Sequence, residues 1–269
     1  MVTDLIYEKA GITFTGSQAP LFEKRALKRM DALELTSMRE YYHYLKYDAK
    51  RESELTELLN ELTVNETYFF REKPQLEVFA KEILPYLKEK NKLTKRIKIW
   101  SAGSSTGCEV YSLAIIVKES GLFDTSWRIM FHGSDINTEV LNYARDGVYT
   151  ESAFRIIDPA IQKKYFTETG EKTFTISSEI KKMVNFSHIN LFNERQMKTM
   201  VGFDVIFCRN VLIYFDIESR KTVANSFNNS LHPGSYFFLG QSESLFKVTT
   251  LFQLKPMQGV LLYYKPEPQ

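Results

Sequence analysis

The sequence predicts an α/β fold with a mainly parallel sheet, preceded by a small all-helical domain. Residues 1–72 place their apolar side chains only at helical spacing, and from residue 96 onward short apolar strands alternate with helices. Strands that alternate with helices are typical of a parallel sheet covered on both faces. The last two predicted strands have no helix between them, which favours an antiparallel hairpin at one edge of the sheet.

The helical domain is predicted from apolar residues that recur every three or four positions. Polar breaks near residues 16–17, 36–37 and 48–49 divide the segment into separate helices. The apolar faces contain Leu27, Met30, Leu33, Leu35, Tyr41, Tyr42, Leu45, Leu55, Leu58, Leu59 and Leu62. We expect this domain to span residues 1–72 and the α/β domain to span residues 73–269.

The α/β domain begins with a helix over residues 79–87. Its predicted strands cover residues 96–100, 128–134, 184–189, 204–208, 235–240 and 260–265. Helices are expected over residues 108–120 and 138–145, between the first three strands. Near residues 165–182, alternating Thr and Phe around Gly170 interrupt this order, which predicts a small inserted β-subdomain built on a hairpin.

Composition and charge argue against several classes of protein. A formal net charge of +2 is too small for the strongly basic surface typical of nucleic-acid binding. Cys108 and Cys208 have no neighbours at metal-ligand spacing, so we expect reduced thiols and no metal site. No apolar run reaches the roughly 20 residues of a membrane span, and the N-terminus lacks the pattern of a signal peptide. These features are typical of a cytoplasmic protein, for which a monomer is the default expectation.

Three segments with glycine or polar residues follow predicted strands, where an α/β sheet binds its ligand. The first contains Gly103 and Gly107, which let the main chain approach a ligand closely. Asp135 ends the second strand, where a carboxylate can accept both ribose hydroxyls, and Asn210 ends a strand expected beside the glycine turn. The turn lacks the glycine spacing of dinucleotide and P-loop sites. The pattern favours an adenosine ligand without phosphate, such as S-adenosylmethionine, with a nicotinamide dinucleotide or an unliganded turn as alternatives.

Six short segments match the motifs of one known family, in the family's order. The first two are N-E-T-Y-F-F-R-E at residues 65–72 and W-S-A-G-S-S-T-G-C-E-V-Y-S at residues 100–112. The others are D-I-N at 135–137, N-L at 190–191, F-C-R-N-V-L-I-Y-F at 207–215 and G-Q-S-E-S-L at 240–245. Together they resemble the CheR-type chemotaxis receptor (protein-glutamate) O-methyltransferases over nearly the whole chain. The resemblance implies a Rossmann-like S-adenosylmethionine methyltransferase domain that follows a helical receptor-docking domain.

The resemblance also implies roles for single residues. Glu109 would hold the methionine part of the cofactor and Asp135 its ribose, while Arg71 and Tyr214 would orient the substrate. With Gly103 of the turn, the cofactor-binding set is Asn65, Thr67, Arg71, Gly103, Glu109, Asp135, Asn190, Leu191, Asn210 and Val211. The chain departs from the family at Cys108 and Val110, where glutamate and proline are usual. The second glutamate of the motif is retained as Glu109, so we expect cofactor binding to survive this departure.

The implied acceptor is the side chain of a glutamate, and the residues are consistent with it. A glutamate with a pKa of about 4.3 is ionised at neutral pH and needs no general base. The planar fork of Arg71 can hold a carboxylate, and Tyr214 can donate to the same group. None of the four histidines lies in a matched segment. The alternative interpretation is a non-catalytic S-adenosylmethionine-binding signalling module, towards which only Cys108 points.

A basic cluster in the helical domain suggests how a partner would be recognised. Lys24 and Lys28 are four residues apart, as are Arg25 and Arg29, and like charges at this helical spacing repel one another. A solvated surface is the default explanation. The alternative is docking to the acidic face of a chemoreceptor cytoplasmic domain, since complementary charge speeds encounter and sets specificity.

Overall fold

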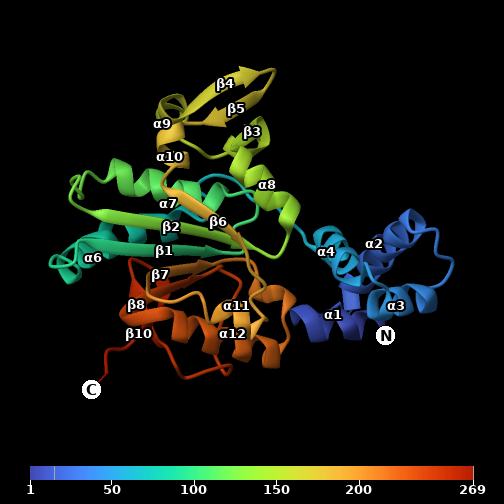
Figure 1. Ribbon diagram of the computed structural model, residues 1–269. Helices are drawn as coiled ribbons and strands as arrows, with labels where there is room; N and C mark the ends of the chain where they lie inside the picture. Colours follow the sequence, from blue (N-terminus) through green and yellow to red (C-terminus); the bar gives the residue numbers. More distant parts are fainter. Residues whose placement is uncertain (15, 269) are drawn as a thin grey trace.

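The computed structural model describes residues 1–14 and 16–268 and shows a group of helices beside an α/β sheet domain (Figure 1). The N-terminal helices are α1 (Val2–Ala10), α2 (Ala19–Ala32), α3 (Met38–Tyr47) and α4 (Arg51–Leu62). Their buried apolar side chains form a core that is separate from the two cores of the sheet domain. The expected all-helical domain is thereby confirmed. No helix in the described part of the chain is long and apolar enough to cross a membrane.

The buried face of α2 differs from the expected one. Phe22, Ala26 and Met30 face the helical core, whereas Leu27 is 46% exposed. Residues four apart share one face of a helix, and Leu27 is turned by about 100° from Ala26 around the axis. The sequence pattern does not identify this buried face, because its central residue is a small alanine and Leu27 beside it is more hydrophobic.

A buried ion pair joins α2 to α4. Arg29 donates from Nε and Nη2 to the two carboxylate oxygens of Glu54, at 3.0 and 2.7 Å. The hydroxyl of Tyr41, in α3, donates to the same carboxylate at 2.7 Å. Because the Glu54 side chain is only 4% exposed, these contacts compensate a charge that would otherwise be buried without a partner. Arg29, which we expected on a basic docking surface, therefore has a structural contact inside the helical domain.

The second domain is built on a seven-stranded sheet with the order β6-β2-β1-β7-β8-β10-β9. The strands are β1 (Arg96–Ala102), β2 (Arg128–Asp135), β6 (Val184–His188), β7 (Phe203–Cys208), β8 (Leu231–Leu239), β9 (Gln253–Met257) and β10 (Val260–Lys265). The adjacent strands β6, β2, β1, β7 and β8 pair in parallel with one another. Strand β10 is antiparallel to both of its neighbours, β8 and β9. The expected α/β fold with a mainly parallel sheet is confirmed.

The hairpin at the sheet edge is formed by β9 and β10. The strands expected at residues 235–240 and 260–265 correspond to β8 and β10 and do pair with each other. The additional strand β9 lies between them in sequence and takes the edge position. Lys255 and Pro256 give β9 the composition of a loop, and an edge strand tolerates proline because one of its sides is unpaired.

Side chains alternate between the two faces of the sheet, as the period of two along a strand requires. In β7, Val205 and Phe207 belong to one core, and Ile206 and Cys208 belong to the other. The first core is covered by α5 (Lys73–Val78), the π-helical segment η2 (Phe79–Ile83), α6 (Leu84–Lys90) and α7 (Cys108–Glu119). The second core is covered by α11 (Glu194–Met197) and α12 (Ile217–Ser230).

A three-stranded antiparallel sheet with the order β3-β5-β4 stands apart from the large sheet (Figure 1, top). We call residues 148–176 the β-subdomain: β3 (Val148–Thr150), η3 (Glu151–Phe154), α9 (Pro159–Tyr165), β4 (Phe166–Gly170) and β5 (Thr173–Ile176). The sequence pattern does not indicate β3, because it has only three residues. It directly follows Gly147, the left-handed end of α8 (Thr138–Asp146).

The helical domain contacts the sheet domain beside the carboxyl ends of the strands. After α1, the N–H of Thr13 donates to the carbonyl of Tyr214 at 3.1 Å. At the end of α4, the carbonyl of Asn60 accepts from Nδ2 of Asn137 at 2.9 Å. One contact follows the first helix of the helical domain and the other lies in its last helix. This domain therefore covers the edge of the sheet where ligands bind.

We predict that Glu54→Ala lowers the free energy of unfolding by about 3 kcal/mol, because it leaves the charge of Arg29 without its buried partner. Urea denaturation followed by circular dichroism measures the change. Glu52→Ala is the matched control on the same helix, since its side chain is 70% exposed and exposed pairs contribute at most about 1 kcal/mol. Equal destabilisation by both substitutions would contradict the stabilising role of the Arg29–Glu54 pair.

Candidate active site

One pocket at the carboxyl edge of the sheet contains the residues that the sequence assigned to the cofactor and to catalysis. It lies between β1 and β7, where the strand order reverses and where open α/β sheets bind ligands. Its walls include Asn65, Thr67, Arg71, Gly103, Glu109, Asp135, Asn190, Leu191, Asn210, Val211 and Tyr214. Ala10, Ile12 and Leu62 of the helical domain line it as well. The pocket is therefore shared by both domains.

Gly103 allows two loops of the pocket to approach each other closely. It follows β1 with a φ of +75°, a conformation that only glycine adopts readily. A Cβ atom at this position would lie 2.3 Å from Cγ2 of Val211, in the loop after β7. Any larger residue would therefore push apart the turn after β1 and the loop after β7.

Asp135 presents a buried carboxylate at the end of β2. Its Oδ2 accepts the N–H of Ser105 at 2.8 Å, and its Oδ1 accepts the N–H of Asn137 at 2.9 Å. Burial raises the pKa of this carboxyl group, and the hydrogen bonds from Asn137 and Ser105 oppose the rise. A carboxylate oxygen can accept more than one hydrogen bond, so Asp135 is suited to receive hydroxyl groups of a ligand.

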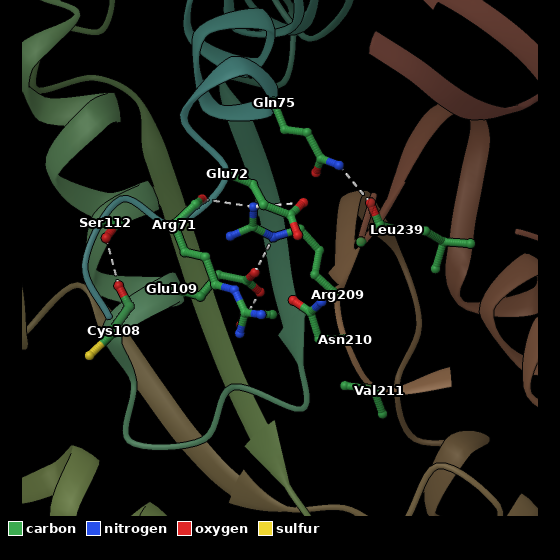
Figure 2. Close-up of polar contacts among 12 residues, drawn as sticks. Arg71, Glu72, Gln75, Cys108, Glu109, Ser112, Arg209, Asn210, Val211 and Leu239 are labelled. Carbon is green, nitrogen blue, oxygen red and sulfur yellow. Dashed lines mark hydrogen bonds and ion pairs between the residues drawn. The ribbon is translucent and has the colours of Figure 1, made fainter. Parts of the chain in front are cut away.

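Arg209 is the centre of a buried polar network in the wall of the pocket (Figure 2). Its Nε donates to Glu109 at 2.5 Å, and its Nη1 donates to the carbonyl of Arg71 at 2.9 Å. Nη1 also lies 3.6 Å from Oε2 of Glu72. Ser101 donates to the second carboxylate oxygen of Glu109 at 2.7 Å. The network fixes the orientation of Glu109. The Arg209 side chain is only 3% exposed, and its positive charge is compensated by the carboxylates of Glu109 and Glu72.

Glu243 holds the loop after β7 from outside the pocket. Its carboxylate accepts the N–H groups of Asn210, Val211 and Gly240 at 2.7, 2.9 and 2.8 Å. Burial raises the pKa of Glu243, and the main-chain donors of Asn210 and Gly240 oppose the rise. Asn210 has a φ of +61°, an uncommon conformation for a residue other than glycine. Glu243 thus stabilises the strained loop that carries Asn210 and Val211 to the pocket.

Sequence reasoning assigned no role to Arg209 or Glu243. Both lie inside the motif segments at 207–215 and 240–245, next to predicted strand ends. Each is the one charged residue of its segment, which was the available signal. Arg209 pairs with Glu109, 100 residues away in sequence, and Glu243 accepts from Asn210, 33 residues away. These pairings therefore could not be predicted from local spacing.

Arg71 lies on the linker between α4 and α5, between two residues with left-handed main chains. Phe70 and Glu72 have φ angles of +59° and +57°. The linker is held in this conformation by Arg209 and by the hydroxyl of Ser112, which accepts the N–H of Phe70 at 3.0 Å. The Arg71 side chain donates from Nη1 to the carbonyl of Glu66 at 3.0 Å. The main chain of Arg71 is therefore fixed while its guanidinium group borders the pocket.

Tyr214 closes the short helix η4 (Leu212–Tyr214) after β7 and lines the same pocket. Burial raises the pKa of its phenol, and the nearby positive charges of Arg25 and Arg71 oppose the rise. The phenol is therefore protonated at neutral pH and can donate a hydrogen bond. The cation Arg71 and the neutral donor Tyr214 thus line the same pocket.

The amide groups of Asn65 and Asn190 are engaged within the protein. Asn65 donates from Nδ2 to Oγ1 of Thr63 at 3.3 Å. Asn190 donates from Nδ2 to the carbonyl of Lys9 at 2.7 Å and so anchors the end of α1. Leu191 contributes apolar surface and is 7% exposed. Asn190 therefore has a structural contact that the sequence did not indicate.

The departure from the family motif at Cys108 and Val110 lies outside the pocket walls. Cys108 is 1% exposed at the start of α7, and its Sγ lies 3.7 Å from Oγ1 of Thr106. Burial raises the pKa of this thiol to about 12. Val110 is buried in the core, whereas Glu109 between them lines the pocket. The substitutions therefore change packing behind the pocket and leave the carboxylate of Glu109 in place.

The four basic residues of α2 separate into two groups. Arg29 pairs with Glu54, and Arg25 donates from Nη1 to the carbonyl of Thr63 at 3.1 Å. Lys24 and Lys28 are exposed, and Lys28 forms an ion pair with Glu61. These partners offset the repulsion expected within the cluster, so the spacing alone does not require an external partner.

Sequence comparisons identify the family. Residues 65–261 match the model of the "CheR methyltransferase, SAM binding domain", and residues 1–63 match that of the "CheR methyltransferase, all-alpha domain". The chain is 36% identical over 263 residues to "Chemotaxis protein methyltransferase 2" of Vibrio cholerae, covering 98% of this chain and 91% of that protein. It is 34% identical to "Chemotaxis protein methyltransferase" of Borreliella burgdorferi, covering 90% and 86% of the two chains. It is 32% identical to the protein of that name from Salmonella typhimurium, covering 94% and 86%. This chain belongs to the CheR family of S-adenosylmethionine-dependent methyltransferases.

Proposed function

We propose that this protein transfers a methyl group from S-adenosylmethionine to glutamate side chains in the cytoplasmic domain of chemoreceptors, and that it acts as a cytoplasmic monomer. One observation carries the proposal: Arg71 and Tyr214 line the same pocket as Glu109 and Asp135. The relatives compared above support it, since each is named a chemotaxis protein methyltransferase. These relatives give no support to a non-catalytic signalling module.

The polar groups of the pocket fit this cofactor. Asp135 would accept the ribose hydroxyls, and the carboxylate of Glu109 would bind the ammonium group of the methionine part. Leu191 and Val211 would offer apolar surface to the adenine. When bound, the cofactor supplies a methyl group activated by a positively charged sulfur. The protein would then contribute orientation of the two reactants and exclusion of water.

The acceptor side of the pocket requires positive charge and hydrogen-bond donors rather than a base. The glutamate carboxylate is ionised at neutral pH, with an ordinary pKa of about 4.3, so no proton has to be removed. Arg71 would hold one carboxylate oxygen, and Tyr214 would donate to the same group. A lone pair of the carboxylate remains free to form the ester bond.

We further propose that residues 1–72 dock the receptor. Lys24 and Leu27 are exposed on α2, and the Lys28 side chain is 67% exposed. Arg25 links this surface to the pocket wall, because its Nη1 donates to the carbonyl of Thr63, which lines the pocket. A positively charged helix face fits an acidic receptor surface. Arg29 would contribute only by stabilising α2 through Glu54.

Incubation with labelled cofactor and purified receptor cytoplasmic fragments tests the proposal. We expect base-labile methyl esters on receptor glutamates. Label that resists base, or ester formation only on small free acids, would contradict the proposed acceptor. Cofactor binding in calorimetry without methyl transfer to any receptor would favour the signalling module instead.

Arg71 and Tyr214 are expected to affect turnover more than cofactor binding. We predict that Arg71→Ala lowers kcat by about 100-fold, because the carboxylate loses its orienting cation. Tyr214→Phe removes one hydrogen bond to a charged group, worth about 1.5–3 kcal/mol, and should lower kcat by about 10- to 100-fold. Steady-state kinetics and calorimetry with S-adenosylhomocysteine separate the two effects. Unchanged turnover in both variants would remove the proposed mechanism.

Gly103→Ala should weaken cofactor binding by at least about tenfold, or about 1.4 kcal/mol, because the new Cβ would overlap Val211. Calorimetry with S-adenosylhomocysteine measures the change. Gly259→Ala is the matched control, since Gly259 also has a positive φ of +81° but no atom within 4 Å of an added Cβ. Similar losses of affinity in both variants would show that Gly103 acts through overall stability and not through the pocket.

A further inference from the structure

The β-subdomain reaches the linker that carries Arg71 through one exposed arginine. Arg155 directly follows η3, and its guanidinium carbon lies 4.2 Å from the ring centroid of Tyr68. Its Nη2 also donates to Oε1 of Glu66 at 3.1 Å. Tyr68 and Glu66 are the residues that the Arg71 side chain contacts. The Arg71 guanidinium carbon lies 5.7 Å from the same ring, and Nη1 donates to the carbonyl of Glu66.

The contact is not explained by stability of the fold. The side chains of Arg155 and Glu66 are 47% and 67% exposed, and exposed ion pairs contribute little. The linker is already anchored on the β-subdomain by Phe69, which is fully buried and stacks on Phe154 at 5.3 Å between ring centroids. The N–H of Phe69 also donates to the carbonyl of Ala153 at 2.9 Å. Removal of the Arg155 side chain therefore leaves the linker attached.

The contact does change which group the Glu66 carboxylate neutralises. Arg71 touches the main chain of Glu66 and not its carboxylate. Rotation of the Glu66 side chain would allow its carboxylate to pair with Arg71, and Glu66 itself lines the pocket. Such a pair would satisfy the cation that is proposed to hold the substrate, because a carboxylate is the preferred partner of a guanidinium group. In the structure the Glu66 carboxylate is paired with Arg155, which also lies over the ring of Tyr68.

We propose that Arg155 is a positioning residue for methyl transfer: it holds the Glu66 carboxylate away from Arg71, so that Arg71 stays available to the carboxylate of the substrate. The inference rests on the proposed function, in which Arg71 orients the acceptor. It assigns to the β-subdomain a direct part in preparing the acceptor side of the pocket. The principle is preorganisation. A charged side chain that is already unpaired and oriented binds its ligand at a smaller cost in free energy.

A double-mutant rescue tests this inference. We expect Arg155→Ala to lower kcat/KM for a receptor fragment by about fivefold, the effect of one exposed ion pair in competition with the substrate. The affinity for S-adenosylhomocysteine and the melting temperature should stay at wild-type values. Adding Glu66→Gln should restore kcat/KM, because the competing carboxylate is gone. Arg155→Lys, which keeps the charge but not the planar contact with Tyr68, should fall between the wild type and Arg155→Ala.

Lys163→Ala is the matched control, because Lys163 is exposed on the adjacent helix α9. A merely structural role of Arg155 predicts no rescue by Glu66→Gln. The inference is overturned if Arg155→Ala retains wild-type kcat/KM, or if the double variant is as slow as Arg155→Ala. If the wild-type protein methylates no receptor, the proposed function fails and this inference fails with it. Wild-type activity with an unaffected Arg155→Ala variant removes this inference alone.

Discussion

The active site depends on the buried guanidinium group of Arg209. It connects the end of β7 to α7 through Glu109 and to the interdomain linker through Glu72 and the carbonyl of Arg71 (Figure 2). A buried cation is costly unless it is paired, and removal of one partner of a buried pair commonly costs about 3–5 kcal/mol. Phe70 and Glu72 adopt left-handed main chains on either side of Arg71, and such conformations are strained. The hydrogen bond from Arg209 to the carbonyl of Arg71 helps to hold this segment in place. One side chain therefore sets the position of the Glu109 carboxylate, which is proposed to bind the cofactor, and of Arg71, which is proposed to orient the substrate.

Glu243 holds a second part of the active site, the loop that follows β7. Its carboxylate accepts main-chain N–H groups of the loop that runs through Asn210 and Val211. Asn210 has a left-handed main chain, as do Phe70 and Glu72 on either side of Arg71, so both loops that carry these pocket residues contain uncommon main-chain conformations. Strained residues persist only where surrounding contacts determine their conformation. Here the contacts are charged side chains with buried partners, which explains why short irregular loops can hold precise positions between two domains.

The sequence predicts the fold well because the hydrophobic pattern of each strand and helix is local. It predicts the pocket because glycine and polar residues follow strands, and parallel strands end at one edge of a sheet. It fails where the decisive contact is distant or the signal is small. Leu27 is more apolar than Ala26 but faces solvent, and β3 is too short to show a period. Arg29 forms a pair with Glu54, 25 residues away, and Arg209 forms one with Glu109, 100 residues away. Charge pairing of this kind is a property of the folded chain and not of local spacing.

The distribution of charge in the pocket is suited to two reactants of opposite sign. Asp135 at the end of β2 and Glu109 at the start of α7 line one side of the pocket. The cation on this side, Arg209, is compensated by Glu109 and Glu72. The sheet side therefore keeps an excess of negative charge, which favours a cofactor with a cationic ammonium and sulfonium. On the linker side, Arg71 and the neutral phenol of Tyr214 favour an anion. Under the proposed function, each reactant would be attracted to its own side, and their reacting groups would be oriented before they meet. Because electrostatic preorganisation of this kind needs no proton transfer, a pocket without a catalytic histidine is sufficient for a carboxylate acceptor.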